Sequence, residues 1–415
     1  MSLGSTAQNL TKMERKLRVI VDRKTWPGPG IRPLFPKAFA HGQSVHTLNV
    51  PAMLLMIGYL TTPPSTTGLS LSEFWAWVRY LAAVSPDSGM ALTRSFADLD
   101  PHQKTILSDD FGMGVPLLWL TDKLALDQVV DGRYFMQKLA ASVGATQKRT
   151  AKRGPNKTPD FVARDDKGRW HVIECKGTQS GREYSATQLG SKGPPAVGGV
   201  AQKCSIIFPS GHTGQRLVCG LSIAVEGGEG SVLKIVDPEP DEPFEVRDND
   251  LGFALDAANR GVMSKALRMA GFEITAETIA SPMGASPDAL RPSTQAADSI
   301  RMRSLNERDQ RSREELLGSF GQHKLFEGKF RGREVTVELP RPIIVDGGVV
   351  RKVIIRQGVN SAALEEIRNR PPIAEVEVDS VGEWADLAGR SSVTSDGVTA
   401  IMQIGSIFRS EIILV

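Results

Sequence analysis

Cysteine is scarce in this sequence of 415 residues, which contains only Cys175, Cys204 and Cys219. Three cysteines at these spacings are too few and too scattered for a disulfide framework, and none lies in a CxxC zinc-binding pattern. A protein stabilised mainly by disulfides is therefore not expected. This cysteine usage fits a reducing compartment, and we expect the protein to be cytoplasmic.

Long apolar segments are also absent. The longest apolar run, 52–60, is too short to span a bilayer. It follows Pro51 rather than a basic segment, so it does not have the form of a signal peptide. We therefore expect no contact with a membrane. The phosphate-loop pattern GxxxxGK[ST] does not occur either, so ATP hydrolysis by that route is not expected.

A large excess of charge of one sign is missing as well. The formal net charge is +3, so nucleic acid would have to be bound through local basic patches. Apolar residues make up 40% of the chain and charged residues 23%, which is the composition of an ordinary globular protein with an ample core. The chain is long enough for about two to three domains.

The segment 158–177 is predicted to be a β-hairpin. Two runs of β-branched or aromatic residues, 161–163 and 170–173, flank a turn-forming sequence at 165–168. Apolar side chains occupy both faces of the second run, so we expect both faces to be partly buried.

The register of this hairpin brings charged residues together. If antiparallel pairing is centred on Lys167, Asp160 lies opposite Glu174, because both are seven residues from the centre. Side chains alternate along a strand, so Glu174 and Lys176 share a face, which Asp160 can share too. Two carboxylates and an ammonium group then converge at one end of the hairpin. The alternative is an ordinary solvated hairpin, on which the glutamate and the lysine simply pair at the surface.

The converging groups suit a metal site for phosphodiester cleavage. The two carboxylates and the backbone carbonyl of Cys175 are the hard oxygen ligands that Mg²⁺ prefers. A divalent cation would relieve the repulsion between the carboxylates, polarise a phosphate and lower the pKa of a bound water. Lys176 would orient the attacking water and offset the charge that grows on the phosphate oxygens.

Pro159 and Asp160, followed after thirteen residues by Glu174, Cys175 and Lys176, resemble the PD-(D/E)XK signature of the restriction-endonuclease-like nuclease superfamily. The resemblance implies that Asp160 and Glu174 bind the metal and that Lys176 is the catalytic lysine. It further implies DNA as the substrate and Mg²⁺ as the cofactor, with Mn²⁺ able to replace it. Bacterial restriction or phage defence is the biological role that the family suggests.

A third acidic ligand is not evident. In this superfamily, the helix before the first motif strand often supplies another acidic residue, usually glutamate. Here no glutamate lies between Glu73 and Glu174, so that role is either vacant or falls to Asp127 or Asp131. We expect 117–139 to be helical with a break near Asp131 and Gly132, which would place these two aspartates one turn apart on one helix face.

Two further groups of residues are candidates for contact with nucleic acid. A segment before the hairpin carries five cations and no acid, namely Lys148, Arg149, Lys152, Arg153 and Lys157. Such a segment can neutralise phosphates without reading sequence, and a solvated, flexible loop is an equally good interpretation. A short helix expected at 199–205 carries Gln202 and Lys203 as accessory residues of the site, although an ordinary polar helix face would look the same.

The predicted fold class is α/β, or α+β overall, with four regions along the chain. Residues 1–125 are expected to be a helical N-terminal region, beginning with a helix at 10–23. Residues 126–280 would form the nuclease core, a central mixed sheet of the restriction-endonuclease-like kind flanked by helices. Residues 281–329 would be a linker and a charged helix, and 330–415 a β-rich or α+β C-terminal domain, because polar and apolar residues alternate there.

Two other functions are compatible with these patterns. A non-catalytic nucleic-acid-binding module could retain the nuclease fold, and the missing upstream glutamate favours it. Alternatively, the nuclease could act only together with a partner chain. Many such nucleases dimerise to cut both strands, so a homo-oligomer is a further alternative.

Overall fold

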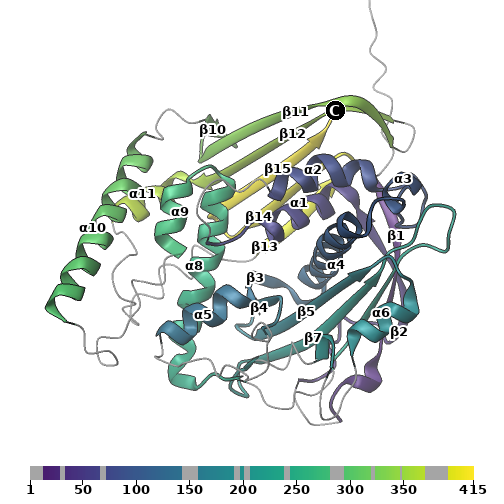
Figure 1. The fold of residues 1–415 in the computed structure, drawn as a ribbon, viewed down its shortest axis with the longest axis horizontal. Helices are drawn as coiled ribbons and strands as arrows, with labels where there is room; N and C mark the ends of the chain where they lie inside the picture. The colour runs from purple at the N-terminus through teal and green to yellow at the C-terminus, as the bar shows by residue number, and fades with distance from the viewer. Residues whose placement is uncertain are drawn as a thin grey trace, which may run out of the picture.

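The computed structural model describes residues 13–28, 33–65, 72–142, 158–190, 197–200, 206–237, 244–280, 294–318, 323–345, 348–369 and 391–415. These residues form a mixed α/β protein in which helices pack around and between two large sheets (Figure 1). The prediction of the α/β class is confirmed at this level. Among the described helices, none combines the length and the apolar character needed to cross a bilayer.

Within the described residues, the first sheet has seven strands of mixed direction. Its strands in spatial order are β2 (Gly42–Asn49), β1 (Glu14–Val21), β8 (Val232–Val236), β7 (Thr213–Ser222), β5 (Trp170–Thr178), β4 (Phe161–Asp165) and β3 (Leu126–Asp131). Strand β1 runs parallel to β8 and β5 runs parallel to β7, whereas the other neighbours are antiparallel. Almost all of β7 is buried, as is typical of a central strand covered on both faces.

Strands β4 and β5 form the predicted hairpin. Its turn contains Gly168, whose φ of 75° is in the left-handed region that glycine adopts without strain. Phe161 pairs with Ile173 at the open end of the ladder. Continuing this register by one residue places Asp160 opposite Glu174, which confirms the predicted pairing.

The described part of the chain between β2 and β3 supplies four helices. They are α1 (Val50–Thr61), α2 (Ser72–Ala83), α3 (Arg94–Ala97) and α4 (Pro101–Leu124). Helix α4 begins after Asp100, whose carboxylate accepts hydrogen bonds from the backbone N–H groups of His102 and Gln103. It packs against β5 through two glycines, because a Cβ on Gly112 would lie only 2.5 Å from the backbone nitrogen of Gly177.

The segments after β3 and β5 complete the part of the molecule that is built on the first sheet. They contain α5 (Gly132–Ser142), α6 (Arg182–Leu189), α8 (Leu251–Met269), α9 (Glu273–Ala280), the short parallel strands β6 (Ile206–Ile207) and β9 (Phe244–Glu245), and the 3-10 turn Asp248–Asp250. A further 3-10 turn, Arg23–Thr25, follows β1. The rings of Trp170 and Phe208 stack at 5.1 Å in a second apolar cluster on this side. Ala254 of α8 belongs to that cluster and Val262 to the main core, so α8 covers the β3 edge of the sheet.

The second sheet, as far as the structure describes the chain, contains six antiparallel strands. Their order is β10 (His323–Leu325), β11 (Phe330–Val345), β12 (Gly348–Asn360), β15 (Phe408–Leu414), β14 (Thr399–Ile404) and β13 (Ser391–Asp396). Two helices accompany it, the charged helix α10 (Gln295–Gly318), which was expected, and α11 (Ser361–Asn369). The buried side chains of this sheet belong to the same continuous core as those of the first sheet.

Helix α1 connects the part of the molecule built on the first sheet with the part built on the second sheet. All of its residues from Val50 to Leu60 are buried. It contacts α2 and α4 as well as strands β14 and β15, and Figure 1 shows it between α4 and the C-terminal strands. A helix that is apolar on all sides belongs in an interior of this kind.

Two expected helices are wrong. Residues 14–21 of the expected helix at 10–23 form strand β1, in which Leu17, Val19 and Val21 are buried at a spacing of two residues. The expected helix at 117–139 is divided into the end of α4, the strand β3 and helix α5. Strands β1 and β2 also join the sheet that contains the hairpin, so residues 1–125 are not purely helical.

Candidate functional site

Asp160, Glu174 and Lys176 lie together at the end of the β4–β5 hairpin. The backbone N–H of Asp160 donates to Oε2 of Glu174 at 3.1 Å, and the N–H of Cys175 donates to Oδ2 of Asp160 at 2.8 Å. Nζ of Lys176 forms an ion pair with Oε1 of Glu174. The structure therefore brings together the three residues that the sequence singles out.

Burial sets the protonation of these groups. The Glu174 side chain is 0% exposed, and burial together with the charge of Asp160 raises its pKa to about 8, against the effect of Lys176. Burial also raises the pKa of Asp160, although Lys176 and the Cys175 N–H oppose it. For Lys176 burial lowers the pKa, but the two carboxylates outweigh it and the net shift is upward. Negative charge in this site is thus costly, and an added cation would stabilise it.

The solvated-hairpin alternative is wrong. Ile173 and Cys175 on one face of β5 belong to the main core, whereas Trp170 and Val172 on the other face belong to the second cluster. Glu174 is therefore enclosed in a strand that is covered on both faces, as expected from its apolar neighbours.

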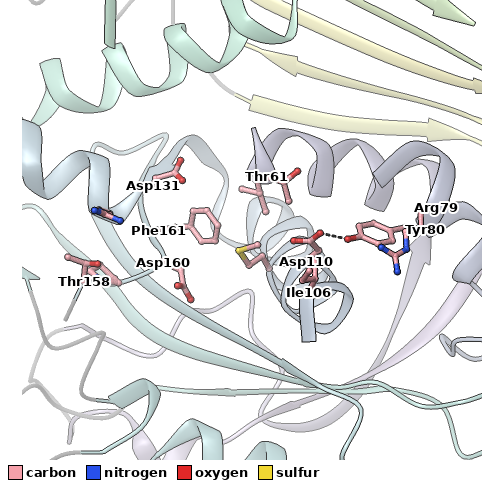
Figure 2. Close-up of a pocket in the computed structure, with 13 residues that line it drawn as sticks. Thr61, Arg79, Tyr80, Ile106, Asp110, Asp131, Thr158, Asp160 and Phe161 are labelled. Carbon is pink, nitrogen blue, oxygen red and sulfur yellow. Dashed lines mark hydrogen bonds between the residues drawn. The ribbon is translucent and has the colours of Figure 1, made fainter. Parts of the chain in front are cut away.

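Asp131 lies at the same end of the sheet but on its other face. It pairs with Phe161 across β3 and β4, and directly opposed residues share a face. Because Asp160 precedes Phe161, its side chain is on the opposite face. In Figure 2 the carboxylates of Asp131 and Asp160 lie on opposite sides of the Phe161 ring. Nζ of Lys265 pairs with Oδ2 of Asp131 at 2.6 Å.

Asp127 is not part of the hairpin site. It lies toward the far end of β3, where Nη1 of Arg164 is 3.4 Å from its Oδ2. Burial raises the pKa of Asp127 to about 7, against the charge of Arg164. The expected helix would have stacked Asp127 on Asp131, but in the strand they are four positions, or about 13 Å, apart.

Helix α4 brings two acidic residues to the site that sequence reasoning missed. Asp109 is close enough to Lys176 for that charge to lower its pKa, although burial gives a net upward shift. Burial raises the pKa of Asp110 to about 6, and Oδ2 of Asp110 accepts a hydrogen bond from the Tyr80 hydroxyl. The adjacent aspartates were a visible signal on an expected helical region. However, only the contact between α4 and β5 reveals their closeness to the hairpin.

A cavity of about 700 Å³ adjoins the hairpin end on the α4 side (Figure 2). Residues from α1, α2, α4, β3, α5 and the start of β4 surround it. Its lining combines apolar side chains with carboxylates and guanidinium groups, namely Leu60, Ile106, Met113, Phe161, Asp110, Asp131, Asp160, Arg79 and Arg133, together with Thr61, Tyr80, Thr158 and Pro159. Asp160 thus belongs both to the hairpin site and to the wall of the cavity.

The remaining predicted site residues are not described by the structure. They are Lys148, Arg149, Lys152, Arg153 and Lys157 of the basic segment and the accessory residues Gln202 and Lys203. Across the residues that the structure does describe, no group of three or more histidine, cysteine, aspartate or glutamate side chains is arranged to hold a metal ion. Asp160 and Glu174 are a pair of carboxylates at the hairpin end and are not part of such a group.

Comparison of the chain with family models, curated proteins and solved structures found no significant match. The chemistry of the site rests on the contacts among Asp160, Glu174 and Lys176.

Proposed function

We propose that this chain is a metal-dependent nuclease that hydrolyses DNA phosphodiester bonds, with a restriction-endonuclease-like fold in the part that contains the hairpin. The observation that carries the proposal is the joint burial of Asp160 and Glu174 beside the ammonium group of Lys176. The seven-stranded mixed sheet with helices packed on it supports the fold assignment.

The donor set fits Mg²⁺. Burial and mutual repulsion raise the pKa of Asp160 and of Glu174, and a divalent cation is the partner that would keep both groups ionised. Mg²⁺ commonly uses one or two carboxylates and retains several waters, so Asp160, Glu174 and the Cys175 carbonyl are sufficient protein ligands. Mn²⁺ also accepts carboxylate and carbonyl oxygens and would substitute. When bound, the metal supplies Lewis acidity toward the phosphate and lowers the pKa of a water.

The protein groups have distinct roles in this proposal. The N–H of Cys175 holds the Asp160 carboxylate, so its orientation is set before the substrate binds. Glu174 holds the ammonium group of Lys176, whose side chain remains 24% exposed and can therefore reach an incoming phosphate. The raised pKa of Lys176 keeps it charged, so that it orients the attacking water and offsets negative charge on the phosphate oxygens. Water attacks the phosphorus directly while the P–O bond to the leaving strand breaks, without a covalent intermediate.

A non-catalytic nucleic-acid-binding module is the second candidate. It is favoured by one observation, since no third acidic side chain joins Asp160 and Glu174 in a metal-binding group among the described residues. A nuclease that is activated by a partner chain would behave in the same way until that partner was added. Bacterial restriction or phage defence is the biological setting that we propose for the catalytic form.

The proposal can be tested with circular plasmid DNA incubated with Mg²⁺, with Mn²⁺ or with EDTA. The wild type is compared with Asp160→Ala and with Asp166→Asn, a control at the exposed hairpin turn. We expect metal-dependent nicking or linearisation by the wild type and by the control only. Equal cutting by Asp160→Ala would overturn the site assignment. DNA binding without cutting by any of the three proteins would favour the binding module.

A further inference from the structure

The cavity beside the hairpin has apolar walls that phosphodiester cleavage alone does not require. Met113 of α4 and Phe161 of β4 contribute to these walls together with Ile106. Phe161 is 2% exposed and follows Asp160 directly in the chain. A flat, apolar body bound there would lie next to the hairpin site, whereas a phosphate or a hydrated cation would gain nothing from these walls.

The polar groups of the cavity point to a ligand that donates hydrogen bonds. Oδ2 of Asp110 accepts from the Tyr80 hydroxyl, and Oδ2 of Asp131 pairs with Nζ of Lys265. Among the described residues, no donor reaches the second oxygen of either carboxylate. Figure 2 shows one oxygen of Asp110 toward Tyr80 and the other toward Phe161, across the cavity. The second carboxylate oxygens of Asp110 and Asp131 can therefore accept hydrogen bonds from N–H groups of a ligand.

We infer that this cavity binds a single unstacked nucleobase, next to the phosphodiester that is cut, and that it selects bases with an amino group. A flat base fits between apolar walls, and its N–H groups satisfy the carboxylates. Arg79 and Arg133 add positive charge to the same lining, which suits the phosphates attached to that base. This inference rests on the proposed nuclease function, because the shared residue Asp160 ties the base to the cleavage site.

The substrate class follows from the same geometry. A base that is paired and stacked in a duplex cannot enter a cavity, so the strand must be single or the nucleotide must be extruded. Guanine, adenine and cytosine carry amino groups that can donate to a carboxylate. Thymine and uracil present two carbonyl oxygens, which a carboxylate repels, with a single N–H between them. The cavity should therefore disfavour thymine and uracil.

The test measures binding in EDTA, so that it does not depend on cleavage. The four deoxynucleoside monophosphates are titrated against the wild type, and a single-stranded oligonucleotide containing 2-aminopurine reports unstacking by its fluorescence. We expect the three amino-bearing nucleotides to bind at least about tenfold more tightly than thymidine monophosphate. A tenfold difference in affinity corresponds to the net free energy of one hydrogen bond. The oligonucleotide should show a saturable rise in fluorescence.

Variants of α4 identify the group that selects the base. Asp110→Asn keeps the size of the side chain and its acceptor for Tyr80, but it offers the cavity an amide donor in place of a carboxylate. We expect this change to reduce the discrimination against thymidine monophosphate by about tenfold. Asp122→Asn, at an exposed position on the same helix, should leave it unchanged. Met113→Trp should weaken the binding of all four nucleotides. Circular dichroism verifies that each variant is folded.

Two results would overturn the inference. One is equal binding of all four nucleotides by the wild type and by Asp110→Asn. The other is the absence of saturable binding by both the mononucleotides and the oligonucleotide. If only the nuclease proposal were wrong, base selection in EDTA would persist, but DNA would not be cut in the presence of metal.

Discussion

Asp160 and Glu174 each bind the backbone of the opposite strand. Oε2 of Glu174 accepts from the N–H of Asp160, and Oδ2 of Asp160 accepts from the N–H of Cys175. These bonds continue the hairpin beyond Phe161 and Ile173, the last residues paired in the regular ladder. The groups proposed to bind the metal therefore also hold the end of the hairpin, so activity and folding must be measured together in every variant.

Replacing Lys176 should separate chemistry from binding. We expect Lys176→Ala to lower the rate of metal-dependent cleavage by about 100-fold or more, because it removes a charge that stabilises the transition state. DNA affinity should change little. Lys176→Arg should recover part of the rate. The control is Lys167→Ala at the exposed hairpin turn, and single-turnover cleavage with a separate binding titration is the measurement. A loss of affinity that matched the loss of rate would contradict a catalytic role.

Glu174 should make the metal-free protein less stable at alkaline pH. Its pKa in the folded state is about 8, above the ordinary value of 4.5. The stability contributed by the protonated form is complete below pH 4.5 and is lost as the pH rises through 8. Glu174→Gln cannot ionise, so at pH 9 in EDTA it should be more stable than the wild type by roughly 2 to 5 kcal/mol, with little difference at pH 5.

Urea unfolding at pH 5, 7 and 9 measures this dependence. Glu183→Gln, at an exposed position of α6, provides the matched control and should follow the wild type at each pH. A constant difference between Glu174→Gln and the wild type would show that Glu174 does not titrate in this range.

Mg²⁺ should stabilise the folded protein, and more strongly at pH 8 than at pH 6. Binding requires ionised carboxylates, and the raised pKa values of Asp160 and Glu174 mean that the metal competes with protons. At about 100 times the dissociation constant the stabilisation is about 2.7 kcal/mol, or a few degrees in the unfolding temperature. Scanning fluorimetry with and without EDTA measures the shift, and Asp160→Asn should abolish it. An equal shift in that variant would place the metal elsewhere.

The contact of α4 with β5 should tolerate no added side chain. A Cβ on Gly177 would lie 1.7 Å from the carbonyl oxygen of Ser108. We expect Gly177→Ala to lower the free energy of unfolding by about 3 kcal/mol, because the helix must move away from the strand. Gly318→Ala, where no atom lies within 4 Å of the added carbon, should be neutral or slightly stabilising. Urea unfolding compares the two, and a small effect at Gly177 would show that α4 moves freely.

The hairpin and its charged end could be predicted because they are local in sequence. The turn residues fixed the centre of the hairpin, and the alternation of side chains then placed Glu174 and Lys176 on one face. The burial of Glu174 also followed from the apolar residues around it. For these features the neighbouring residues contain the necessary information.

The acidic residues around the hairpin could not be assigned in this way. Asp127 and Asp131 fit the period of a helix as well as that of a strand, and only pairing with β4 decides between them. Asp109 and Asp110 are distant in sequence, and a close contact of glycines brings their helix to β5. Strand β1 was missed because its exposed side chains are charged, which is also typical of a surface helix.

The position of α1 affects how the protein is synthesised. Strand β14, which covers one side of α1, emerges from the ribosome about 340 residues later, or roughly 20 to 70 seconds at ordinary rates of translation. During that interval a helix with apolar residues on every side lacks part of its cover. Newly made chains should therefore need chaperones until the last strands are complete, and their yield should depend on how fast those strands are translated.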